Sequence, residues 1–145
     1  MHAMEISRTG LDIEWRRLEV ISENLANAST VRTAGGERYQ PRHLTSGPKS
    51  DFASYLNRNA KSAGKAERLD GVMVYGIEAD QTPPRMVHEP DNPQADADGF
   101  VSYPGTNQAA EMVLMAKTAR AYEANIVAMN AARQMYAKAL ELGGR

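Results

Sequence analysis

Three histidines, His2, His43 and His88, are the first residues to test for chemistry, because imidazole serves both as a general base and as a metal ligand near neutral pH. No two of them have the spacing of metal ligands, and none stands beside a Ser and an Asp in a nucleophile pattern. The sequence contains no cysteine, which excludes disulfides, thiol nucleophiles and thiolate metal sites. We therefore expect surface or half-buried histidines without a catalytic role.

An acidic stretch at residues 91–99 raises the question of a calcium-binding loop. When Asp96 and Asp98 are aligned with an EF-hand loop, Gln94 stands where the loop requires an acid, and Gly105 stands where it requires a bidentate Glu. Neither residue meets the requirement. The flanking residues also have the pattern of strands rather than helices. A structural turn built from Asx side chains and a Gly hinge is the interpretation we favour.

The remaining candidates for chemistry are also weak. Gly35 and Gly36 lack the spacing and the strand–helix context of a phosphate-binding loop. Glu67 and Asp70 form a pair of carboxylates, but they lie in polar sequence that gives no reason for acid–base catalysis. The sequence therefore predicts no enzyme, no cofactor, no metal site and no small-molecule substrate.

Length and composition limit the possible partners. The chain has 145 residues, which suits one domain or one compact part with extended helical ends. Its net charge is −1 with both signs interspersed, so no basic face indicates nucleic acid. No run approaches the roughly 18 apolar residues of a membrane span, and charged residues occupy the N-terminus. We expect neither membrane insertion nor a cleaved signal peptide.

Apolar residues recur at helical spacing at both ends of the chain. The N-terminal set is Met4, Leu11, Trp15, Leu18, Ile21, Leu25 and Ala28, and the C-terminal set is Met112, Met115, Ala119, Tyr122, Ile126, Met129, Tyr136 and Leu140. Each set forms a narrow stripe close to an a/d seam, so each helix needs another helix to cover it. The pattern at the two ends of the chain favours an assembly subunit over an enzyme.

The boundaries of the two helices can be predicted from their end signals. The first helix should stop between Asn27 and Thr30, and Gly10 within it costs roughly 1 kcal/mol relative to Ala. The second helix should begin after Asn107 as N-cap and stop at Gly143. A helix of that length spans about 54 Å, which is too long for a compact protein of this size.

The middle of the chain contains most of the Gly and all of the Pro residues. Residues 71–78, 85–88 and 99–103 have the composition of short strands in a small antiparallel sheet. Residues 46–70 are polar, and within them 51–59 could form either a short helix or a mobile loop. The predicted fold is α+β: long N- and C-terminal helices pair as a coiled-coil-like bundle around a small antiparallel β segment. We expect the chain to divide into an N-terminal helix at 1–30, a β-rich and loop middle region at 31–105, and a long C-terminal helix at 106–145.

Several motifs resemble those of one protein family. The segment Asn24-Leu25-Ala26-Asn27-Ala28 could be an ordinary helix end by itself, but it resembles the N-terminal signature of the bacterial flagellar rod and hook proteins. Residues 30–39 and 87–101 resemble one branch, the proximal rod proteins, as do 111–113 followed by 119–126. His88 stands where the family more often has an aromatic residue such as Tyr, and residues 46–70 match no pattern of the family.

The resemblance implies a structural subunit of the proximal rod of the flagellar basal body, which transmits torque across the periplasm. It implies partners among copies of itself and other rod subunits, and export by the flagellar type III apparatus without a cleaved signal peptide. In the family, the terminal helices pair into a coiled-coil-like inner tube and the middle segment forms outer contacts. The alternative is a non-polymerising, secreted helical-hairpin protein that acts as a binding or effector protein.

The predicted assembly interface combines the two stripes with the Asn residues beside them. Its members are Leu11, Trp15, Leu18, Ile21, Asn24, Leu25, Asn27, Ala28, Met112, Met115, Ala119, Tyr122, Asn125, Ile126, Met129 and Tyr136. We expect the N-terminal members to pack against the C-terminal ones, both within the subunit and against neighbouring subunits. Such contacts would be heterologous and would generate a helical array.

Overall fold

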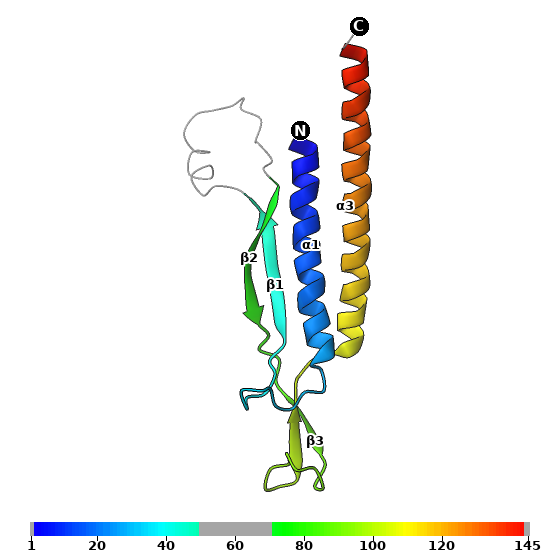
Figure 1. Ribbon diagram of the computed structural model, residues 1–145. Helices are drawn as coiled ribbons and strands as arrows, with labels where there is room; N and C mark the ends of the chain where they lie inside the picture. Colours follow the sequence, from blue (N-terminus) through cyan, green and yellow to red (C-terminus); the bar gives the residue numbers. More distant parts are fainter. Residues whose placement is uncertain (1, 50–70, 144–145) are drawn as a thin grey trace, which may run out of the picture.

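In the computed structural model, residues 2–49 and 71–143 are described, and they form an elongated molecule (Figure 1). The elements in chain order are α1 (His2–Ala26), β1 (Arg42–Pro48), β2 (Val72–Ala79), β3 (Arg85–His88), β4 (Phe100–Tyr103) and α3 (Gln108–Gly143). Two long helices and a small antiparallel β segment confirm the predicted α+β class. The alternative helix or loop at 51–59 lies outside the described residues.

Helix α1 is the central element, with α3 antiparallel to it on one side and the β1–β2 ribbon on the other (Figure 1). Helix α1 ends at Ala26, where the side-chain amide of Asn27 donates to the Glu23 carbonyl oxygen at 2.9 Å. This end lies one residue before the predicted range of Asn27 to Thr30, whereas the start of α3 at Gln108 confirms the prediction. At α3, the Ala110 amide donates to Asn107 Oδ1 at 3.1 Å, as expected of an N-cap.

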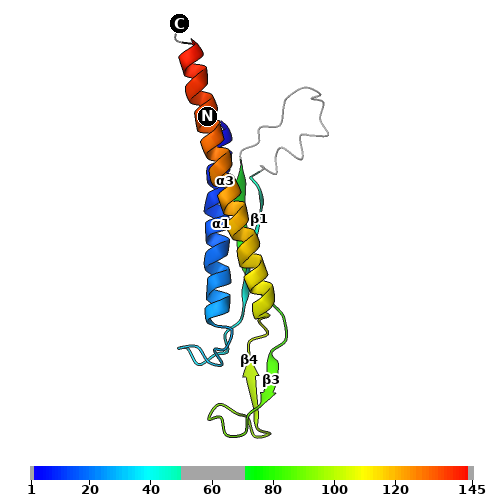
Figure 2. The same cartoon turned by 90° about the vertical axis from the view of Figure 1, so that its right-hand side faces the viewer.

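The strands form two separate two-stranded antiparallel sheets rather than one sheet. β2, β3 and β4 confirm the predicted strands, whereas β1 was not predicted. β1 pairs with β2 from Arg42 opposite Ala79 to Pro48 opposite Val72, with an irregularity between Thr45 and Ser46. β3 and β4 project as a second hairpin at the end opposite the C-terminus (Figure 2).

Contacts on two sides of α1 correct the expectation of one narrow stripe per helix. Ile13 and Val20, both outside the predicted set, are buried at 5% exposure. They lie on a second face of α1, which contacts the β1–β2 ribbon. On this face, Thr9 Oγ1 accepts a hydrogen bond from the Val72 amide at 3.1 Å, and Arg17 Nη2 donates one to Ser46 Oγ at 2.8 Å. A helix packed on two sides needs two apolar stripes, and the sequence contains both.

The loop between β3 and β4 confirms the predicted Asx turn with a Gly hinge. Asp96 Oδ1 accepts hydrogen bonds from the Asp98 amide at 3.0 Å and the Phe100 amide at 2.8 Å. Gly99 has a φ of 80°, a left-handed conformation that favours glycine. Asp96 therefore acts within its own loop.

None of the described helices has an apolar stretch that would suit a membrane span.

Candidate assembly interface

The α1–α3 seam is the largest contact between any two of the described elements and runs along most of α1 (Figures 1 and 2). A Cβ built on Gly10 would lie 3.0 Å from the Asn125 side chain, so the missing side chain lets the two helices approach closely. Trp15 and Tyr122 lie on the same seam with ring centroids 6.3 Å apart. The helices therefore pair in one antiparallel register, with Gly10 opposite Asn125.

The predicted interface residues divide into three groups by exposure. Ile21, Asn24 and Ala28 are buried. The half-buried group is Leu11, Leu18, Leu25, Asn27, Met115, Ala119, Tyr122, Asn125, Ile126 and Met129. Trp15, Met112 and Tyr136 remain exposed, at 57%, 60% and 45%. The subunit's own fold thus covers most of the set, and the part of the prediction that concerns neighbouring subunits stays a prediction.

A polar cluster centred on Asn24 joins several elements at the C-terminal end of α1. Asn24 is 1% exposed, and its Oδ1 accepts hydrogen bonds from Tyr39 Oη at 2.9 Å and from the Arg42 amide at 3.0 Å. Its Nδ2 donates to the Arg42 carbonyl oxygen at 2.9 Å and, more weakly, to Glu111 Oε1 at 3.4 Å. One side chain therefore joins α1 to the following loop, to β1 and to the first turn of α3.

The other members of this cluster were not among the predicted interface residues. Glu111, in the first turn of α3, is 7% exposed, and its Oε2 has no hydrogen-bond partner among the described residues. Burial raises the pKa of Tyr39, although the nearby Arg42 acts in the opposite direction. The only sequence signal for the cluster was an Asn next to an apolar seam.

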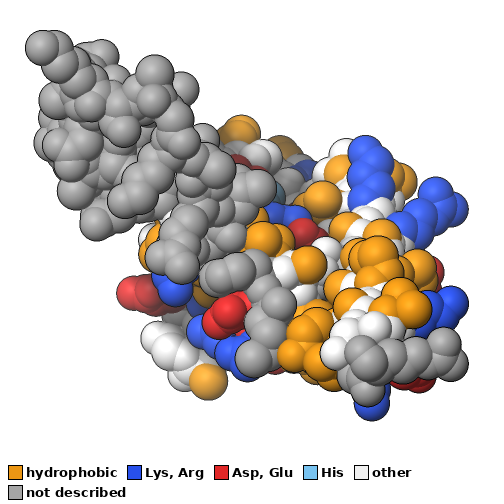
Figure 3. Space-filling view, turned by 90° about the horizontal axis from the view of Figure 1, so that it is seen from above, with side chains coloured by type: hydrophobic (Ala, Val, Ile, Leu, Met, Phe, Trp, Pro, Cys, Tyr) orange, Lys and Arg blue, Asp and Glu red, His pale blue; other side chains and the backbone are white. Residues whose placement is uncertain are grey.

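Large apolar side chains lie uncovered on several elements. On α3 they are Met112, Val113, Leu114, Val127, Met135, Tyr136, Leu140 and Leu142, and on β2 they are Met73, Tyr75 and Ile77. Figure 3, viewed from the end where α3 protrudes, shows hydrophobic side chains gathered there with Lys and Arg beside them. Exposed apolar surface on this scale is typical of a protein–protein interaction site.

The described histidines lie where surface histidines were expected. His43 Nε2 is 3.0 Å from Asp80 Oδ2 at the edge of the ribbon, and the His43 side chain is 48% exposed. Hydrogen bonds from Thr82 and His43 hold the pKa of Asp80 below its usual value. The exposed His88 ring packs edge-on against Phe100, with centroids 5.0 Å apart. Among the described residues, no group of three or more His, Asp or Glu could hold a metal ion.

Comparisons with known proteins point to one structure in the cell. Residues 97–142 match the protein family described as "Flagellar basal body rod FlgEFG protein C-terminal". The chain is 36% identical to the flagellar basal-body rod protein FlgC of Bacillus subtilis, over 98% of this chain and 97% of that protein. It is 33% identical to FlgC of Borreliella burgdorferi, over 97% and 95% of the two chains. With FlgC of Salmonella typhimurium the identity is 31%, over 99% and 97%.

Proposed function

The chain belongs to the family of flagellar basal-body rod proteins FlgC, and we propose that it forms the proximal part of the rod. As a member of that family it is a structural subunit of the flagellar basal body, where it assembles with other rod components. The finer proposal is that copies polymerise helically with one another and with other rod subunits, and that the array transmits torque across the periplasm.

The exposed apolar surface of α3 is the observation that carries this proposal. Helix α3 packs against α1 along one side, yet Val127 and Leu142 on it are 67% and 79% exposed. Exposing side chains of this size to water is costly, at roughly 25 cal/mol per Å² of apolar surface. Assembly with neighbouring helices would remove that cost, and contacts between unlike surfaces repeat into an open helical array.

The elongated shape suits a subunit that carries load along one axis. The β3–β4 hairpin lies at one end of the molecule and the protruding part of α3 at the other (Figure 2). We propose that the helices form the inner wall of the rod, while the β elements make outer contacts. Export by the flagellar type III apparatus, without a cleaved signal peptide, is part of the same proposal.

Composition analysis of purified basal bodies tests this function. Hook–basal bodies isolated from cells that carry a tagged copy of the chain should contain the tag, and gold-labelled antibody should mark the rod below the hook. Tagged protein found only free in the culture medium, with none in the particles, would instead support a non-polymerising secreted protein.

A further inference from the structure

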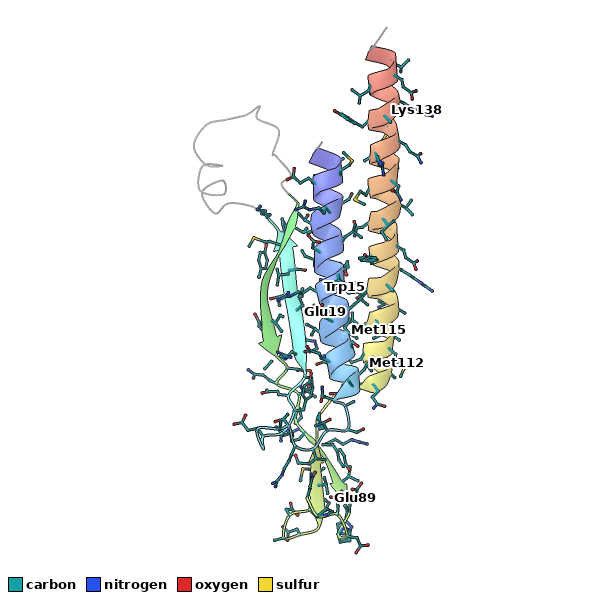
Figure 4. All side chains as sticks on the ribbon, in the orientation of Figure 1. Trp15, Glu19, Glu89, Met112, Met115 and Lys138 are labelled. Atoms are coloured by element: carbon teal, nitrogen blue, oxygen red, sulfur yellow. The ribbon has the colours of Figure 1, made fainter. Side chains whose placement is uncertain are left out.

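The last part of α3 extends beyond its partner helix. Because Gly10 lies opposite Asn125 and the helices are antiparallel, residues 134–143 lie past the described start of α1. We call this segment the α3 tip; all of its residues are exposed, and Lys138 marks it in Figure 4. Met135, Tyr136, Ala139, Leu140 and Leu142 lie along one stripe of the tip at helical spacing. The tip thus presents an apolar stripe that its own subunit leaves uncovered.

A groove of about 890 Å³ lies on the outer face of α1. Its floor includes Asp12, Trp15, Arg16 and Glu19 of α1, and its walls are formed by residues 72–74, 76 and 77 of β2 and by Tyr122 of α3. Figure 4 shows Trp15 and Glu19 midway along the molecule, far from the labelled Lys138. Trp15, at 57% exposed, and Met73, at 43%, supply uncovered apolar surface within the groove.

We propose that the α3 tip of one copy docks into this α1–β2 groove of a second copy. The inference rests on the proposed rod function and specifies one of its contacts. A copy cannot fill its own groove, because its α3 is one continuous helix whose tip points away from the groove (Figures 1 and 2). The contact is therefore intermolecular, and since tip and groove are different surfaces, it repeats without closing.

Length and charge favour the tip as the occupant. The tip spans about 15 Å, and the part of α1 that lines the groove, from Thr9 to Glu19, spans about as much, at 1.5 Å per residue. The groove floor carries two acids, Asp12 and Glu19, against one base, Arg16. Arg133, just before the tip, and Lys138 lie at the margins of its apolar stripe against one acid, Glu141, so the net charge around the stripe is positive. Opposite charge around apolar centres fixes the register of a contact.

Cross-linking between two marked copies tests the contact directly, because the natural chain has no cysteine. Cells would express one copy with Leu140→Cys and a differently tagged copy with Glu19→Cys, and isolated basal bodies would be treated with a short bismaleimide. Both positions are exposed, so the substitutions leave the subunit core intact. We expect a heterodimer that carries both tags. The matched control pairs Leu140→Cys with Met86→Cys, which is 51% exposed on the distant β3, and should give none.

The outcomes separate the docking contact from the rod function. If both copies are present in the particles but the groove pair gives no heterodimer, or no more than the control, the docking contact is overturned while the rod function stands. Cross-linking of Leu140→Cys to a different rod protein in place of the second copy also overturns it. If the untagged natural chain is itself absent from basal bodies, the rod function fails and the docking contact fails with it.

Discussion

Asn24→Ala is expected to lower the free energy of unfolding by about 3 kcal/mol, because it removes the buried side chain that accepts two hydrogen bonds and donates two more. The Tyr39 hydroxyl and the Arg42 amide both donate to Oδ1 of Asn24, whose side chain is 1% exposed. The substitution also frees the Arg42 carbonyl oxygen and loosens α3 at Glu111. Urea denaturation of the purified chain, followed by circular dichroism, measures the loss.

Asn27→Ala is the matched control from the same sequence motif. The side-chain amide of Asn27 donates to the Glu23 carbonyl oxygen within the same helix end, at 2.9 Å, and Asn27 is partly exposed to water. Its removal should change the free energy of unfolding by about 0.5 kcal/mol or less. Similar losses in the two variants would contradict the role of Asn24 as the centre of the cluster.

Leu18→Asp combined with Met129→Asp is expected to abolish motility while export of the subunit stays normal. Both side chains are half-buried on the facing sides of α1 and α3, and a carboxylate placed there must give up hydration without gaining a partner. The two helices would separate, and the surface that we propose polymerises would be lost. Swimming in soft agar measures motility, and immunoblots of culture medium and particles measure export and incorporation.

Ser22→Asp combined with Asn130→Asp controls for added charge on the same two helices. Both positions are exposed, so the charges remain hydrated and swimming should persist. Normal swimming of the Leu18→Asp, Met129→Asp variant would contradict an assembly role for the seam. Loss of the variant from both cells and medium would indicate degradation, and the seam would then be shown to stabilise the subunit itself.

The helices could be predicted from the sequence because their signals are local. At the two helix ends, the side chains of Asn27 and Asn107 bind backbone groups that are no more than four residues away in the sequence. β1 was missed because its only large apolar residue is Leu44, and its pairing with β2 joins segments far apart in the chain. Ile13 and Val20 are absent from the predicted stripe because that stripe runs along one side of α1, whereas the ribbon covers a second side.

The interface was predicted less completely, since its polar members meet only in three dimensions. Asn24 was predicted to lie beside the seam, but its partner Glu111 is 87 positions away along the chain. Nothing local to Tyr39 or Arg42 indicates that they join this cluster. Met112 and Tyr136 continue the apolar repeat of α3, yet both remain exposed, because the repeat alone does not say which partner covers it.

Electron microscopy of basal bodies from a strain that lacks this chain tests its role as a rod subunit most directly. If the chain is a structural part of the proximal rod, flagellar growth should stop before the hook appears, and the membrane rings should carry no rod with a hook. Restoring the chain should restore complete particles. Complete hook–basal bodies in the deletion strain would contradict the account.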